Sequence, residues 1–297
     1  VEMVEGKQDL TSAIGLNSAI HNGARTLGPA LAGVAVAAMG EAVAFFLNGL
    51  SFLAVITSLL LMRDLPHVAR AEQREPAVLS RVREGVRYVL GQQTLLVLMS
   101  LVAVSSFLAR PYQTLMPVFA DVLLRESAQP VVAFLCDGGS LLRCQAPEAL
   151  PLGLLLSAVG VGAVMGAVLV ASLPERARRG RWLTLGNLAL PALLLGFVNS
   201  RSFVLSLLLL LLVGMGQVFQ NSLANTLLQI TTPDELRGRV MSQYALVTQG
   251  MHHLGGLQAG FMADWIGAPL SVGIGAALSL AYGLFVALRF PRLRLLT

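Results

Sequence analysis

The sequence predicts an all-α protein that crosses a membrane several times. Its 297 residues are 55% hydrophobic and 12% charged, and the mean hydropathy is +0.72. The charges gather in short clusters between apolar runs of roughly 20 residues, the length of helix that crosses a bilayer. The eight predicted spans are residues 13–38, 42–62, 94–120, 152–173, 182–199, 203–230, 240–265 and 268–290.

Basic residues alternate along the chain in a way that predicts its orientation. Of the 21 lysines and arginines, 16 fall on one side, three fall on the other, and Arg25 and Arg110 lie inside spans. Because basic loops stay in the cytoplasm, we expect both termini and the arginine-rich linker at 63–93 to be cytoplasmic. This topology explains the pI of about 9.9 without a basic face, so nucleic acid is not an expected partner.

An internal repeat supports the same layout. Shifting the chain by 227 positions aligns residues 21–40 with 248–267, and each copy is followed by another span, which favours a duplication. If the second half has six helices, four helices of the first half lie outside this sequence. The identical pairs are Gly23 and Gly250, Leu27 and Leu254, Gly28 and Gly255, Ala32 and Ala259, Gly33 and Gly260, and Gly40 and Gly267.

Three domains follow from this layout. Residues 1–62 are a two-helix remnant of an N-terminal half, 63–93 are a cytoplasmic linker, and 94–297 are a six-helix C-terminal half. Within the linker, the stretch from Val82 to Leu90 is amphipathic, which favours a position along the membrane surface.

Polar side chains inside two spans mark a candidate site, because such groups are costly at membrane depth. They point either to a water-filled cavity or to hydrogen bonds between helices. Arg110 attracts an anionic group or binds carbonyls freed by Pro111 and Pro117, two prolines that also permit bends. The stripes, each on one helical face, are Ser106, Arg110 and Gln113 in 94–120, and Gln217, Asn221 and Asn225 in 203–230.

His252 and Arg25 occupy equivalent positions in the repeat. A histidine at this depth either carries protons or packs as a hydrogen-bonded side chain. Its neighbour His253 is expected to face another direction, and no further ligand cluster predicts a metal site. None of the 16 acidic residues lies well inside a predicted span.

The outer loop at 125–151 contains both cysteines of the chain, Cys136 and Cys144. An oxidising exterior would allow a disulfide that closes this loop, and two unpaired cysteines in a variable insertion are the alternative.

Five stretches carry a family resemblance: NGARTLGPALAG, AFFLNGLSFLAV, RPYQTLMPVFADVL, GLLLSAVGVGAVMGAVL and PDELRGRVMSQYAL. They resemble the major facilitator superfamily, and within it the bacterial drug and siderophore exporters of the drug:proton antiporter type. The resemblance covers nearly the whole chain except 125–151. It implies the major facilitator fold lacking its first four helices, so that the spans correspond to helices 5 to 12.

Further roles follow from this resemblance. Gly28, Pro29 and Gly33 resemble the antiporter motif of helix 5, although Ala32 replaces one glycine, and tight packing alone is the alternative. Gly162 and Gly166 form a second small-residue face, which we expect to pack against the stretch with Gly28 and Pro29.

The basic loops carry two more predictions. The loop at 174–181 resembles a cytoplasmic latch motif, or its arginines serve topology alone. Thr232 and Glu235 are expected to form a capping box, and Arg237 and Arg239 either pair with acidic groups or contact anionic lipid.

The resemblance implies secondary active export of a small amphipathic molecule by alternating access, with proton coupling, in a bacterial inner membrane. The small-molecule substrate, protons and the lipid bilayer are the expected partners. A truncated, non-transporting fragment or a partner of another transporter is the alternative. No enzymatic motif is present, so we expect neither catalysis nor a cofactor.

Overall fold

The computed structural model describes residues 36, 39–61, 78–136, 147–174 and 178–295. Every regular element among these residues is helical, as the composition predicted. The chain divides into two compact units, residues 1–75 with 129–157, and residues 76–128 with 158–297. Six of the described helical segments are long and apolar enough to cross a membrane, namely those at 42–61, 93–123, 147–171, 179–199, 203–231 and 268–289.

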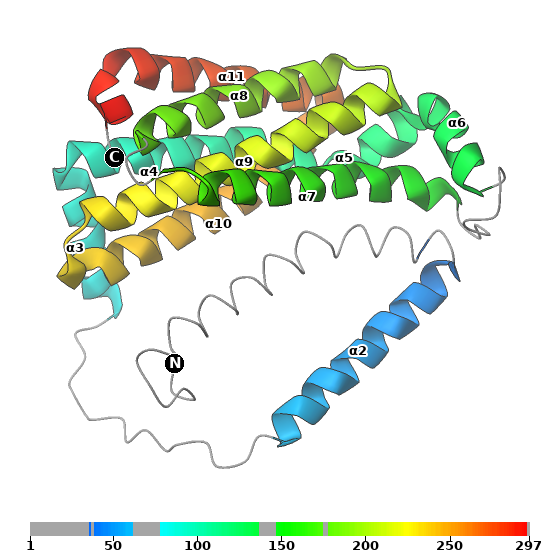
Figure 1. Ribbon diagram of the computed structural model, residues 1–297, viewed down its shortest axis with the longest axis horizontal. Helices are drawn as coiled ribbons and strands as arrows, with labels where there is room; N and C mark the ends of the chain where they lie inside the picture. The colour runs from blue at the N-terminus through cyan, green and yellow to red at the C-terminus, as the bar shows by residue number, and fades with distance from the viewer. Residues whose placement is uncertain (1–35, 37–38, 62–77, 137–146, 175–177, 296–297) are drawn as a thin grey trace. The chain divides into compact units, whose positions relative to one another are not determined.

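The first unit contributes α2, Glu41–Leu61 (Figure 1). Its sequence is apolar around the whole helix, and within the described residues large side chains such as Phe45 and Leu60 are 74% and 79% exposed. A helix that is hydrophobic on all faces is suited to lipid rather than to water.

Gly40 and Gly267, which the repeat pairs, both have a positive φ angle. Their φ angles are 80° and 85°, in the left-handed region that glycine enters without steric cost. The Gly40 N–H donates to Val36 at 2.8 Å, and the Gly267 N–H donates to Ala263 at 2.9 Å, again 227 positions apart. The two glycines that the sequence repeat pairs therefore share both a positive φ angle and the same backbone hydrogen bond.

The second unit is a helical bundle. In Figure 1, α8 and α9 run side by side, and α8 also packs against α11. α10 runs from one end of the bundle to the other, but its sequence is less apolar than that of the six candidate spans. The elements are α3 (Val78–Gly91), α4 (Gln93–Val104), α8 (Arg179–Asn199), α9 (Phe203–Thr231), α10 (Asp234–Ile266) and α11 (Ala268–Arg289).

Shorter pieces complete the path of the chain. α7 (Leu150–Ala171) and α6 (Arg125–Cys136) each have residues in both units. The remaining elements are η1 (Ser105–Ala109), η2 (Arg110–Gln113), α5 (Met116–Val118), η3 (Phe119–Leu123), η4 (Pro147–Ala149) and η5 (Pro291–Leu295).

Close glycine contacts join α7 to α9. A Cβ on Gly162 would lie 1.8 Å from the Leu211 carbonyl oxygen, and a Cβ on Gly214 would lie 2.0 Å from that of Val159. Small residues let two helix backbones approach this closely. The small-residue face of α7 therefore packs on α9, whereas its expected partner, the stretch with Gly28 and Pro29, lies outside the described residues.

The linker helix α3 packs on α10. Val89 is buried in the core, and a Cβ on Gly85 would lie 3.4 Å from the Arg239 carbonyl oxygen and 3.5 Å from Gln243. The amphipathic stretch therefore places one side on the bundle while Leu90 stays 62% exposed.

Candidate functional site

The span at 93–123 is not a continuous α-helix. Ser105–Ala109 form a π-helical turn, closed by a bond from the Arg110 N–H to the Ser105 carbonyl, and a 3₁₀ turn follows at Arg110–Gln113. Pro111 has no N–H to continue the α-helical ladder. The sequence predicted bends here, and the structure shows a change of helix type, a feature often found at functional sites.

Two glycines on neighbouring helices enclose the π-helical turn. A Cβ on Gly255 of α10 would lie 2.2 Å from the Phe107 carbonyl oxygen, and a Cβ on Gly275 of α11 would lie 2.3 Å from that of Leu108. Both positions require glycine because the backbones touch. The irregular turn is therefore fixed in place by α10 and α11.

Arg110 and Gln217 meet just beyond this turn. With the Gln217 amide oriented so that its oxygen faces the guanidinium, it accepts from Nε and Nη2 of Arg110 at 3.2 and 3.1 Å. The Tyr112 hydroxyl lies 3.3 Å from the same amide, and Gln113 Nε2 donates to that hydroxyl at 3.3 Å. The structure thus brings together three of the predicted residues, with Tyr112 as a fourth member that is 1% exposed.

The stripe on α9 continues toward Tyr244 of α10. The Tyr244 hydroxyl donates to the Asn221 carbonyl at 3.2 Å and also makes a side-chain hydrogen bond with Asn225. Asn225 Oδ1 in turn accepts from Gln229 Nε2 at 2.5 Å. Sequence reasoning missed Tyr244, whose signal was a polar-tipped aromatic residue inside a span.

A buried polar chain lies beside this group. Ser105 Oγ donates to Gln220 Oε1 at 2.8 Å, and Gln220 Nε2 donates to Asn187 Oδ1 at 2.8 Å. These three residues, from η1, α9 and α8, are at most 5% exposed. Ser106, which the sequence placed in the site, is 1% exposed and belongs to neither hydrogen-bonded group.

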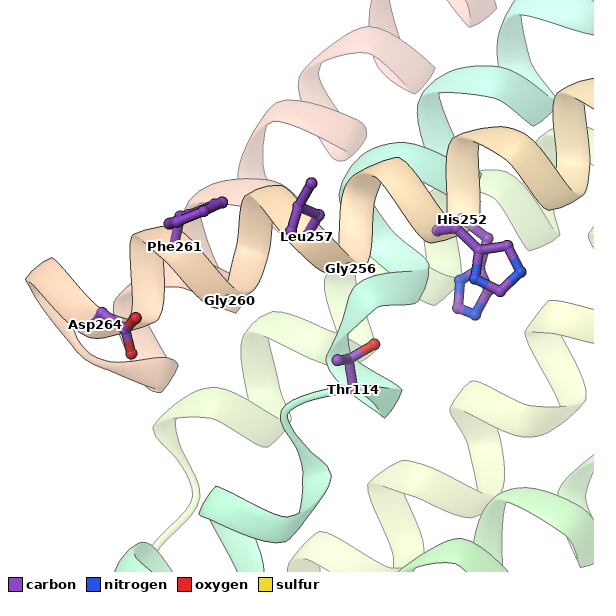
Figure 2. Close-up of a pocket in the computed structure, with 8 residues that line it drawn as sticks. Thr114, His252, Gly256, Leu257, Gly260, Phe261 and Asp264 are labelled. Atoms are coloured by element: carbon purple, nitrogen blue, oxygen red, sulfur yellow. The ribbon is translucent and has the colours of Figure 1, made fainter.

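His252 and His253 line one pocket of about 530 Å³ on α10. Their ring centroids are 5.5 Å apart, so both rings reach the same pocket although His253 is the more exposed of the two. Figure 2 shows His252 at one end of this pocket and Asp264 at the other, with Thr114 opposite α10. Among the described residues, no group of three or more His, Cys, Asp or Glu could hold a metal ion.

Other predicted residues lie away from these groups. Arg239 forms an ion pair with Glu84 of α3, so an acidic partner is present, and Arg237 Nε donates to the Gln229 carbonyl at 3.2 Å. Cys136 is disulfide-bonded. Five predicted residues fall outside the described part of the chain, namely Arg25, Gly28, Pro29, Gly33 and Cys144.

Comparison with known proteins gives one finding. A family model described as Major Facilitator Superfamily matches residues 1–255. No curated protein and no solved structure matches the chain.

Proposed function

Since this chain belongs to the Major Facilitator Superfamily, a family of secondary transporters, we propose that it exports a small amphipathic molecule of the drug or siderophore class. In this proposal, alternating access carries the molecule outward across a bacterial inner membrane, and inward proton flow drives it. The candidate substrate cavity is lined by Arg110, Gln113, Gln217, Asn221 and Asn225, with Ser106 behind it.

The observation that carries the proposal is the Arg110–Gln217 pair at the break in the span. A guanidinium at membrane depth is expensive and is found where it faces the bundle interior or a water-filled cavity. Here it is half-buried, it lies where the helix changes type, and the Gln217 amide faces it. Such a group can hold an anionic or strongly polar part of a substrate.

The orientation and the coupling residues complete the proposal. The distribution of basic residues supports cytoplasmic positions for both termini and for the 63–93 linker. His252 and Arg25 are the candidate coupling residues in the two repeats, while Gly28, Pro29, Gly33, Arg237 and Arg239 are candidates for conformational roles.

Transport measurements on the protein in lipid vesicles test this function. Arg110→Ala should lower export of a fluorescent amphipathic substrate at least tenfold, since it removes the charge from the proposed cavity. Arg201→Ala, which removes an exposed loop arginine, is the matched control and should leave export unchanged. Equal export by both variants at equal protein abundance would reject the cavity assignment.

Proton coupling has its own test. Acidifying the side to which the substrate is exported should accelerate export. The same acidification in the presence of a protonophore, which dissipates the pH difference, should not accelerate it. Export that ignores the gradient would remove protons from the mechanism while leaving transport in place.

A further inference from the structure

A large pocket lies where the start of α8 meets the C-terminal turn η5. Its volume is about 740 Å³, and its lining is Arg178, Arg181, Trp182, Thr184, Leu185, Leu188 and Arg294. η5 reaches α8 because residue 180 is glycine, where a Cβ would lie 1.7 Å from the Leu293 carbonyl oxygen. In Figure 1, the red turn that ends the described chain lies at the same end of the bundle as the first turn of α8.

One rim of this pocket is cationic. Arg178 is the N-cap residue of α8, Arg181 lies in the first turn of α8, and Arg294 comes from η5. The Arg294 side chain is held by a bond from its Nη2 to the Ala287 carbonyl at 2.7 Å. No acidic residue belongs to the described lining, so the rim attracts an anion.

The opposite wall is apolar. Arg181, Leu185 and Leu188 follow at i, i+4 and i+7 and therefore share one face of α8. At 1.5 Å per residue, this face changes from charged to aliphatic over about 10 Å. Leu185 is 56% exposed and Trp182 is 38% exposed, and tryptophan is enriched at the boundary between headgroups and hydrocarbon.

We propose that this pocket binds an anionic phospholipid. The phosphate diester lies against Arg178, Arg181 and Arg294, and the acyl chains descend along Trp182, Leu185 and Leu188. Guanidinium groups match phosphate oxygens in charge and geometry. A free inorganic phosphate would leave the apolar wall uncovered, whereas a phospholipid matches both the rim and the wall. The ligand is thus a lipid held in the leaflet at the end of the bundle that carries the basic loops.

Fluorescence quenching tests the proposal on the full chain in bilayers. The sequence has two tryptophans, so Trp265→Phe leaves Trp182 as the only reporter. Phosphatidylglycerol and phosphatidylcholine, each brominated on the acyl chains, are compared at the same mole fraction in an unbrominated phosphatidylcholine background. The brominated phosphatidylglycerol should quench Trp182 more strongly, and each Arg→Gln change at 178, 181 or 294 should reduce the preference about fivefold.

Two controls separate the outcomes. Arg201→Gln, a loop arginine outside the pocket, should keep the preference for phosphatidylglycerol, and circular dichroism confirms that every variant is folded. Equal quenching by both lipids in the parent chain would overturn the proposal without reference to any variant. Reversal of the preference by millimolar inorganic phosphate would also overturn it, because the pocket would then be a site for a free anion.

Discussion

Replacing Gln220 with methionine tests whether the buried polar chain holds three helices together. Gln220 accepts from Ser105 Oγ and donates to Asn187 Oδ1, both at 2.8 Å. Methionine has a similar length and volume but offers neither strong partner, so packing changes little while both bonds disappear. We expect Gln220→Met to destabilise the bundle at the point where η1, α8 and α9 meet.

The magnitude follows from what each partner does after the change. The Ser105 hydroxyl can turn to a carbonyl of its own helix and so recovers part of its loss. Asn187 is 5% exposed, so its oxygen loses its bond from Gln220 in a site that water barely reaches, at a cost of about 1–3 kcal/mol. Hydrogen bonds between helices in membranes average only about 0.6 kcal/mol each, so the two lost bonds alone set the lower end of the range. With the buried Asn187 oxygen left without its bond from Gln220, the expected loss of unfolding free energy is about 1–3 kcal/mol.

Unfolding in mixed micelles, followed by circular dichroism as the mole fraction of dodecyl sulfate rises, measures this loss. Thr226→Val is the matched control on α9, because the Thr226 hydroxyl bonds only the Ser222 carbonyl of its own helix at 2.9 Å. It should cost less than about 0.5 kcal/mol. A double-mutant cycle with Ser105→Ala should show coupling of about 0.6 kcal/mol or more. Strict additivity, or a Gln220→Met loss no larger than that of the control, would refute the reasoning.

The same titration checks three further predictions. Gly255→Ala should lower the unfolding free energy by about 1–3 kcal/mol, because its Cβ would overlap the π-helical turn. Its control is Gly250→Ala, which has open space around it and should be neutral or stabilising by up to about 1 kcal/mol. Equal effects of the two changes would contradict the close contact at Gly255. Gly267→Ala should lower the unfolding free energy by about 1–2 kcal/mol, because the φ angle of this residue is 85°. A neutral result would contradict the positive φ angle. Glu84→Gln should cost less than about 1 kcal/mol, since its pair with Arg239 is 56% and 35% exposed, and a larger loss would mean that the pair is shielded from water.

Hydropathy predicted the regular helices well. The spans expected at 182–199 and 203–230 are helices at 179–199 and 203–231, because a long apolar run in lipid has few alternatives to a helix. The change of helix type near Pro111 was predicted only as a bend. Its π-helical register depends on Gly255 and Gly275, which are distant in sequence, and local rules cannot include them.

The polar contacts were harder to predict than the helices. Tyr112 and Tyr244 complete the site because of how α9 and α10 face the broken span, and neither position carries a periodic signal of its own. The capping box expected at Thr232 was wrong: Pro233 is the N-cap of α10, and the Thr232 hydroxyl instead donates to the Leu228 carbonyl at 2.6 Å. A threonine between two helices can satisfy either one, and the sequence does not decide which.

The one-residue connection at Gly267 bears on how the protein is assembled in the membrane. Only this residue separates α10 from α11, so joining the two helices costs almost no loop-closure entropy. The chain itself sets their register before any other helix packs against them. Contacts so close in sequence form early, and α10 and α11 should therefore enter the bilayer together as a helical hairpin. The less apolar α10 would then be carried in by its more apolar partner.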